Sequence, residues 1–126
     1  MNTVARTILV VDDEAAIREV VKFKMEREGF VVQTAIDGAD ALDQVAGARP
    51  DIIVLDLSMP KMDGYEFCSG LQSSADGRAI PIIVLSARSQ PADRARCAQF
   101  QVRDFVLKPF SPRDLARRIR DVLEAG

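Results

Sequence analysis

The 126-residue sequence has no histidine, no tryptophan and only two cysteines. Without histidine, catalysis by an imidazole base, Ser-His-Asp hydrolysis and His-ligated metal sites are excluded. Cys68 and Cys97 form no CxxC motif and are too few for a disulfide framework, so we expect a reducing, cytoplasmic environment. Any chemistry must come from carboxylates, lysine, hydroxyl groups or a bound metal ion.

Long hydrophobic runs are also missing. No apolar stretch approaches the roughly 20 residues of a membrane span, and Met1–Arg6 is too short and too polar for a signal peptide. The length suits one domain. We therefore predict a single domain over residues 1–126, with no output domain in this chain and no membrane binding.

Charge is distributed unevenly along the chain. Residues 1–87 hold 8 Lys/Arg against 14 Asp/Glu, whereas residues 88–126 hold 9 against 5. The acidic part indicates a cation site, and the basic part indicates an anionic partner. Solvated helix faces explain the basic part equally well.

Five short runs rich in β-branched residues predict strands: Thr7–Val11, Phe30–Ala35, Asp51–Leu55, Pro81–Leu85 and Asp104–Leu107. Four of them lack clean alternation, which is typical of strands buried on both faces of a parallel sheet. Helices are expected between and after them, over Glu14–Glu28, Asp37–Ala46, Gly64–Ser74, Ala92–Phe100 and from Ser111 onward. This alternation predicts an α/β fold.

The first predicted helix has an apolar stripe. Ile17, Val20, Val21 and Met25 are expected to face the sheet. Phe23 lies beside the stripe and is expected to be partly exposed; packing at the edge of the core explains it more simply than a docking role.

Side chains with a carboxylate, a hydroxyl group or an amine follow four of the five predicted strands. Parallel strands end at one edge of a sheet, so these groups are expected to lie together there. They are Asp12, Asp13 and Glu14 after the first strand, Asp56 after the third, Ser86 after the fourth and Lys108 after the fifth. Two carboxylates about 4 Å apart repel by about 4 kcal/mol at an effective dielectric constant of about 20. A divalent cation would relieve this repulsion, and oxygen ligands alone favour Mg²⁺.

A carboxylate, a hard cation, a lysine and a hydroxyl group at one point favour phosphoryl transfer. Asp56 is the predicted nucleophile because it ends a central strand, and Asp12 and Asp13 are then metal ligands. Taken singly, these residues have simpler readings: Asp12 or Asp13 as a helix N-cap, Ser86 as a turn hydroxyl, Lys108 as a surface lysine. The functional interpretation depends on their joint placement.

Four motifs in this order resemble the receiver domain of bacterial two-component response regulators. They are VVDDE (Val10–Glu14), VLDLSMPKMDGYEF (Val54–Phe67), VLSA (Val84–Ala87) and FVLKPF (Phe105–Phe110). The resemblance extends from Ile8 to Leu123. It implies a flavodoxin-like, doubly wound α/β fold: a five-stranded parallel sheet in the order 2-1-3-4-5, with helices on both faces.

The resemblance also implies a phosphoacceptor site. Asp56 would receive a phosphoryl group from a sensor histidine kinase or a histidine phosphotransfer protein. Asp13, Asp56 and the backbone carbonyl of Ser58 would bind Mg²⁺ directly, and Asp12 would act mainly through water. Lys108 would pair with the phosphoryl oxygens. The chain would then be no enzyme beyond its own phosphorylation and dephosphorylation.

The resemblance implies a switch formed by Ser86 and Phe105. Ser86 would form a hydrogen bond with the phosphoryl group, and Phe105 would swing inward. The family usually has Tyr where this chain has Phe105. The bond from Lys108 to Pro109 is expected to be cis. Gln101 and Arg103 stand where the family usually has Gly and Asp. A left-handed conformation at Gln101 would cost roughly 1 kcal/mol relative to Gly.

The family's output surface would comprise the helix over residues 92–100, the fifth strand and the last helix. Seven arginines gather there: Arg94, Arg96, Arg103, Arg113, Arg117, Arg118 and Arg120. We expect a downstream protein partner with an acidic surface, or a separate output domain, and no direct binding of nucleic acid by this chain. The last helix could instead form a dimer that depends on phosphorylation.

Three rival functions are ranked lower. A haloacid-dehalogenase-type phosphatase needs a second acid two residues after its nucleophile, where this chain has Ser58. A flavodoxin-type electron carrier needs a hydroxyl-rich loop after the first strand, where this chain has acids. A degenerate receiver that only binds proteins would have lost the acceptor and the lysine. Whether the chain acts alone or is part of a larger regulator is left open.

Overall fold

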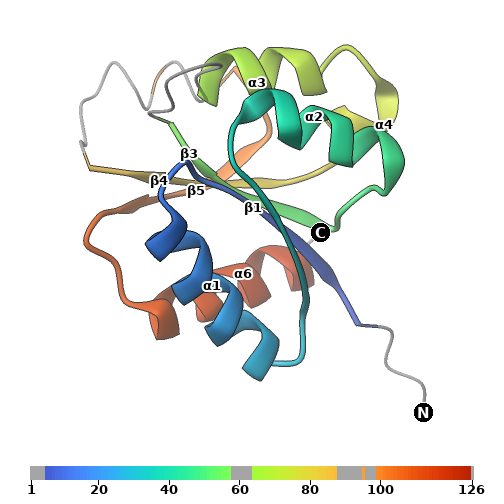
Figure 1. Ribbon diagram of the computed structural model, residues 1–126. Coiled ribbons are helices and arrows are strands. Elements are labelled where there is room, and N and C mark those ends of the chain that lie inside the picture. Colours follow the sequence, from blue (N-terminus) through green and yellow to red (C-terminus); the bar gives the residue numbers. More distant parts are fainter. Residues whose placement is uncertain (1–4, 58–63, 88–94, 96–98, 126) are drawn as a thin grey trace.

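Five parallel strands form one sheet in the order β2-β1-β3-β4-β5 (Figure 1). The computed structural model describes residues 5–57, 64–87, 95 and 99–125. The strands are β1 (Thr7–Val11), β2 (Val31–Ala35), β3 (Ile52–Asp56), β4 (Ile82–Ser86) and β5 (Val102–Leu107). The expected strand order is confirmed, and β5 begins two residues earlier than predicted.

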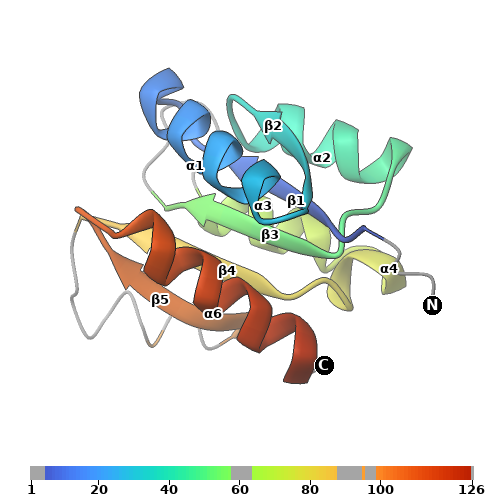
Figure 2. The ribbon, with the colours of Figure 1, turned by 90° about the horizontal axis from the view of Figure 1, so that it is seen from below.

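Helices cover both faces of the sheet. In Figure 1, α1 (Ala15–Arg27) and α6 (Pro112–Ala125) lie below the sheet, and α2 (Gly38–Gly47) and α3 (Gly64–Leu71) lie above it. Figure 2, the view from below, shows α1 and α6 in front of the strands. Most of the helix expected over residues 92–100 lies outside the described residues. No helix among the described residues is long and apolar enough to cross a membrane.

The central strands are buried on both faces, which explains why their sequences do not alternate. Leu9 and Val11 of β1 pack in the core between the sheet and α2 and α3, whereas Ile8 and Val10 pack in the core between the sheet and α1 and α6. All residues of β3 and β4 are buried. Because both faces must be apolar, a polar residue in these strands is confined to the end of the strand.

The predicted end of α1 and start of α6 are confirmed to within one residue, whereas α3 ends at Leu71, three residues before the predicted Ser74. Ser111 Oγ accepts a hydrogen bond from the Asp114 backbone N–H at 3.2 Å and so caps the start of α6. Gly29, with φ of 96°, follows the end of α1 in the left-handed region that glycine adopts without strain. On α6, Leu115 and Ile119 are fully buried.

The orientation of α1 differs from the prediction at Val20, which is 48% exposed. Val21 and Met25 are fully buried, and Ile17 packs against the same core. Val20 lies about 100° around the helix from Val21, so a face centred on Val21 turns Val20 toward solvent. Phe23 is partly exposed as expected, with 65% of its surface accessible.

A helical turn that the sequence analysis did not predict, α4 (Ala75–Arg78), precedes β4. Within it, Gly77 donates its backbone N–H to Ser74 Oγ at 3.0 Å and accepts a hydrogen bond from Gln101 Nε2 at 2.7 Å. Among the described residues, no residue other than glycine has a positive φ. Gln101 therefore does not take the left-handed conformation considered above, and its side chain ties β5 to α4 instead.

Gly77→Ala is expected to destabilise the fold by about 2 to 3 kcal/mol, because a Cβ atom at this position would lie 2.2 Å from the backbone oxygen of Leu71. Backbone cannot move aside as cheaply as a flexible side chain. Urea denaturation measures the loss. Gly47→Ala is the control, because a Cβ atom there meets nothing within 4 Å; equal midpoints for the two variants would contradict the close packing at Gly77.

Candidate functional site

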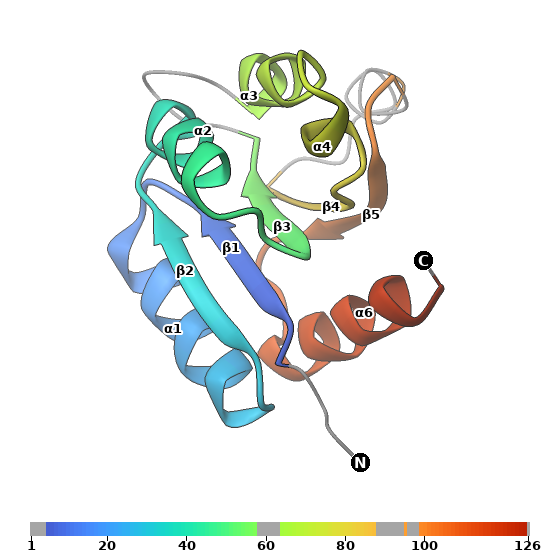
Figure 3. The ribbon, with the colours of Figure 1, turned by 90° about the vertical axis from the view of Figure 1, so that its right-hand side faces the viewer.

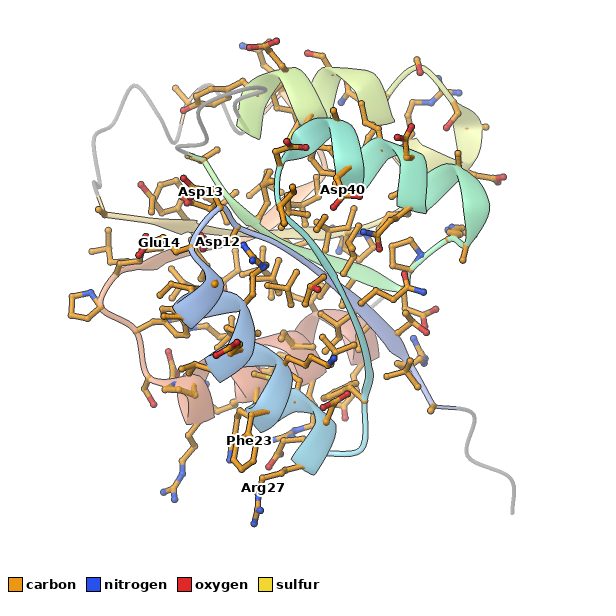
Figure 4. All side chains as sticks on the ribbon, viewed as in Figure 1. Asp12, Asp13, Glu14, Phe23, Arg27 and Asp40 are labelled. Atoms are coloured by element: carbon orange, nitrogen blue, oxygen red, sulfur yellow. The ribbon has the colours of Figure 1, made fainter. Side chains whose placement is uncertain are left out.

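The carboxyl ends of four strands bring the predicted groups to one edge of the sheet. Asp12 follows β1, Asp56 ends β3, Ser86 ends β4 and Lys108 follows β5. In the strand register Asp56 lies opposite Leu85, one residue before Ser86. Figure 4 shows Asp12 and its two neighbours where β1 passes into α1. The predicted convergence is confirmed for each of these residues; Ser58 lies outside the described residues.

Three carboxylates form a compact cluster at this edge. Asp12, Asp13 and Asp56 each place a carboxylate oxygen within 4.8 Å of the other two. Asp12 is fully buried and Asp56 is 4% exposed, whereas Asp13 is open to solvent. Magnesium ligands lie about 2 Å from the ion, so oxygens on opposite sides of one ion are about 4 Å apart. The oxygen-only donor set and its spacing therefore fit Mg²⁺, with an open side for water or a further ligand.

Lys108 supplies the positive charge within the cluster. Its Nζ lies 3.4 Å from Asp12 Oδ2, 3.4 Å from Asp56 Oδ2 and 3.7 Å from Glu14 Oε1. Burial by itself would lower the pKa of Lys108, but the carboxylates of Asp12 and Asp56 outweigh it and hold the pKa above its usual value. The side chain therefore stays a charged ammonium group at neutral pH.

The negative charge of the Asp12 carboxylate is only partly balanced by the positive charge nearby. Burial raises the pKa of Asp12 to about 6, the hydrogen bond from the Glu14 backbone N–H opposes this rise, and the nearby charge of Asp56 adds to it. One ammonium group thus does not balance two buried carboxylates. A divalent cation would favour the charged form of both.

Hydrogen bonds fix the loop that carries Asp12. Asp12 Oδ1 accepts from the Glu14 backbone N–H at 2.9 Å, and the Asp12 backbone N–H donates to the Ala35 carbonyl at 3.2 Å. Arg18 on α1 donates from Nη1 to the Asp12 carbonyl at 2.7 Å. This role of Arg18 was not predicted from the sequence; its place one turn into the helix after the acidic run was the available signal.

Of the two predicted switch residues, Ser86 ends β4 beside the cluster, whereas Phe105 lies within β5, opposite Val84. Ser86 is 6% exposed, and its carbonyl accepts a hydrogen bond from the Lys108 backbone N–H at 2.8 Å. The following bond, from Lys108 to Pro109, is cis as expected. Phe105 is half-buried and packs against the core beneath α2 and α3. A change at Ser86 can therefore reach β5 through direct contact.

An apolar hollow lies next to the cluster, between α1 and the segment after β5. It has a volume of about 390 Å³, and Ile17, Val20, Phe110 and Pro112 line it, with Lys108 at its edge. Farther along α1, the Arg27 guanidinium lies 5.4 Å from the centre of the exposed Phe23 ring (Figure 4). This part of α1 presents apolar groups beside a charged site, as a protein-docking surface does.

Ion pairs neutralise much of the arginine-rich C-terminal helix. Arg118 Nη1 lies 2.8 and 2.9 Å from the two carboxylate oxygens of Asp104, and Arg118 Nε lies 2.8 Å from Asp114 Oδ2. Arg117 also pairs with Asp114, and Arg120 pairs with Glu28 of α1. Fewer positive charges on α6 are therefore free to attract an acidic partner than the sequence suggests. Arg94 and Arg96 lie outside the described residues.

Comparison with known proteins identifies the family. The family model of the response regulator receiver domain matches residues 8–120. A probable transcriptional regulator, ycf27, of Guillardia theta is 42% identical over 116 residues, which is 92% of this chain and 44% of that relative. The response regulator MprA of Mycobacterium avium is 41% identical over 116 residues, 92% of this chain and 50% of MprA. The chain thus spans about half the length of these relatives.

Solved structures with the same fold support this result. The chemotaxis protein CheY4 of Vibrio cholerae superposes with a TM-score of 0.90 at 30% identity, over 94% of this chain and 99% of that structure. The signal receiver domain of a signal transduction histidine kinase from Syntrophus aciditrophicus gives 0.86 at 34% identity, over 96% and 92%.

Proposed function

The chain belongs to the response regulator receiver domain family, and we propose that it is a phosphoacceptor switch whose Asp56 takes a phosphoryl group from a sensor histidine kinase or a histidine phosphotransfer protein. One observation carries the proposal: the Asp56 carboxylate lies at the end of a buried strand, 3.4 Å from Lys108 and within the Asp12 and Asp13 cluster. A nucleophile, a fixed cation and a metal-binding group therefore share one site.

In the proposed transfer, a carboxylate oxygen of Asp56 attacks the phosphorus of the phosphohistidine. The P–N bond breaks, its electron pair stays on the imidazole nitrogen, and Asp56 becomes an acyl phosphate. The ammonium group of Lys108, which follows β5, stabilises the negative charge on the phosphoryl oxygens. Bound Mg²⁺, held by Asp13, Asp56 and the Ser58 carbonyl, with Asp12 acting through water, would neutralise the phosphoryl oxygens.

The response to phosphorylation would begin at Ser86. Its hydroxyl group would donate a hydrogen bond to the phosphoryl group, and the half-buried Phe105 would turn inward, which changes the surface formed by β5 and α6. This two-state change would be the signal that the chain passes to a downstream partner or output domain, or to a second copy of itself. The chain would catalyse nothing beyond its own phosphorylation and dephosphorylation. Its location would be the cytoplasm, because two cysteines without a CxxC motif are too few for a disulfide framework.

The phosphate donor would dock on the apolar hollow beside α1, because that surface borders Lys108 and includes the exposed Val20. Val20→Glu is expected to slow transfer from a phosphohistidine protein at least about tenfold, because the variant puts a charge into an apolar contact. The rate with acetyl phosphate, which needs no docking, should stay the same. Transfer is followed by gel electrophoresis with radiolabelled donor.

Val31→Glu is the matched control for this experiment. Val31 begins β2 and is 48% exposed, as Val20 is, but it does not line the hollow. The control variant should accept phosphate from the protein donor at the wild-type rate. Equal slowing by both substitutions would place the donor elsewhere.

Small phosphate donors test the proposed function without a cognate kinase. Acetyl phosphate or phosphoramidate plus Mg²⁺ is expected to add one phosphoryl mass to the intact protein, as measured by mass spectrometry. The same mixture with excess EDTA should add none. Without Mg²⁺, the negatively charged oxygens of the phosphate donor would approach carboxylates whose charge no metal ion balances. An adduct that forms equally well in EDTA would contradict the magnesium-dependent site.

A further inference from the structure

A second cavity opens at the opposite edge of the sheet from Asp56. It has a volume of about 380 Å³, within the usual range for ligand sites, and arginines from three different segments line it. Arg6 lies just before β1, Arg49 lies between α2 and β3, and Arg103 lies in β5. Figure 3 views the molecule from this side, where β1 and β3 begin and α6 ends. Nothing in the proposed phosphoryl transfer uses this cavity.

Among the described residues, these three arginines differ from most others because their side chains make no hydrogen bond, ion pair or aromatic contact there. The described residues include ten arginines, and six of them contact an acid, a carbonyl or an aromatic ring. Four of the ten make no such contact in the part of the chain described, and three of those four line this cavity: Arg6, Arg49 and Arg103. The fourth, Arg113, lies elsewhere on α6. Unpaired guanidinium groups are thus concentrated at one place.

Asp51, the one acid among the described residues of the lining, does not balance this charge. Asp51 Oδ2 accepts a hydrogen bond from the Thr7 backbone N–H at 2.7 Å, so its carboxylate is already engaged. With Asp51 ionised, the lining carries a net charge of +2, from three arginines and one aspartate. Guanidinium groups repel one another, and the paired oxygens of a carboxylate or a phosphate group satisfy their forked N–H donors.

The rest of the lining is apolar and rigid. Pro50 and Pro81 precede β3 and β4, and Val122 and Leu123 close the cavity from α6. Proline fixes the backbone, so this part of the wall needs no ordering when a ligand binds. An apolar wall with a rim of arginines suits a ligand that has both anionic groups and an uncharged body.

We propose that this cavity binds a small molecule carrying a diphosphate group, with the phosphates held by Arg6, Arg49 and Arg103 and the remainder of the ligand against Pro50, Pro81 and Val122. A diphosphate presents several phosphoryl oxygens, enough to accept hydrogen bonds from all three unpaired guanidinium groups. The ligand would touch β5 and the last turns of α6. This inference stands apart from the phosphoacceptor function, because it uses no residue of the Asp56 site.

Isothermal titration with inorganic pyrophosphate and with ADP tests the proposal, in buffer with EDTA and without Mg²⁺ so that the acidic site repels both ligands. Saturable binding with a dissociation constant below about 1 mM is expected at low ionic strength. The double variant Arg49→Gln/Arg103→Gln should bind at least about tenfold more weakly. Arg113→Gln, which removes an unpaired arginine outside the cavity, should bind as the wild type does.

A substitution that is expected to strengthen binding shows that weaker binding in the other variants does not come from unfolding alone. Asp51→Asn keeps an oxygen for the Thr7 N–H but removes the negative charge, so it should tighten binding several-fold. Tighter binding of ADP than of pyrophosphate would support contact between the uncharged part of the ligand and the apolar wall, and equal affinities would contradict that contact. No saturation with either ligand, or equal weakening by Arg113→Gln, would overturn it. Asp56→Asn should bind both ligands unchanged, which separates this result from the phosphoacceptor function.

Discussion

Asp56→Asn is expected to abolish phosphoryl incorporation completely, from acetyl phosphate and from a phosphohistidine protein alike. An amide has the shape of the carboxylate but is far too weak a nucleophile to attack phosphorus. The fold should persist, and removal of one charge from the cluster should lower the pKa of Asp12 from about 6 toward its ordinary value. Intact-protein mass spectrometry measures the adduct, and an NMR titration measures the pKa.

Asp43→Asn is the control, because this exposed residue of α2 lies outside the carboxylate cluster. It should take up one phosphoryl group at the wild-type rate. An adduct of normal yield on the Asp56→Asn protein would mean that another side chain is the acceptor.

Lys108→Ala is expected to separate metal binding from phosphoryl transfer. The Lys108 ammonium lies 3.4 Å from both Asp12 and Asp56, so it competes with Mg²⁺ for the same oxygens. Its removal should leave Mg²⁺ affinity unchanged or higher. The rate of phosphorylation at saturating Mg²⁺ should fall by about a hundredfold, because the charge that develops on the phosphoryl oxygens loses a fixed cation.

Two measurements on the same variant check this expectation: Mg²⁺ titration by calorimetry and the time course of the acetyl phosphate adduct. Lys22→Ala, on the solvent side of α1, should change neither. If the alanine at position 108 weakened Mg²⁺ binding as much as it slowed phosphorylation, Lys108 would only maintain the structure of the acidic loop.

The fold and the position of the site were predictable for one physical reason. Strands buried on both faces cannot carry polar side chains except at their ends, so Asp56 and Ser86 had to lie at the sheet edge. Parallel pairing then brings the ends of neighbouring strands together, and β1, β3 and β4 are neighbours. The sequence therefore located the cluster without any knowledge of side-chain contacts.

Pairing of exposed side chains was not predictable in the same way. Arg118 and Asp104 are 14 residues apart, and Arg120 and Glu28 are 92 apart, so their contacts depend on how α6 lies against β5 and α1. The exposure of Val20 likewise depends on the rotation of α1 about its own axis, which the apolar pattern fixes only within one residue. Loop conformation had to await the structure too: Gln101 gains a partner in α4, a turn with no strong sequence signal.

The site of phosphorylation is the most direct test of the account. After treatment with acetyl phosphate and Mg²⁺, borohydride reduces an acyl phosphate to an alcohol, and tandem mass spectrometry locates the altered residue. The account predicts homoserine at position 56, the last residue of β3, and no altered residue when EDTA replaces Mg²⁺. Reduction at a different aspartate, or at position 56 irrespective of Mg²⁺, would contradict a magnesium-dependent site assembled around Asp56.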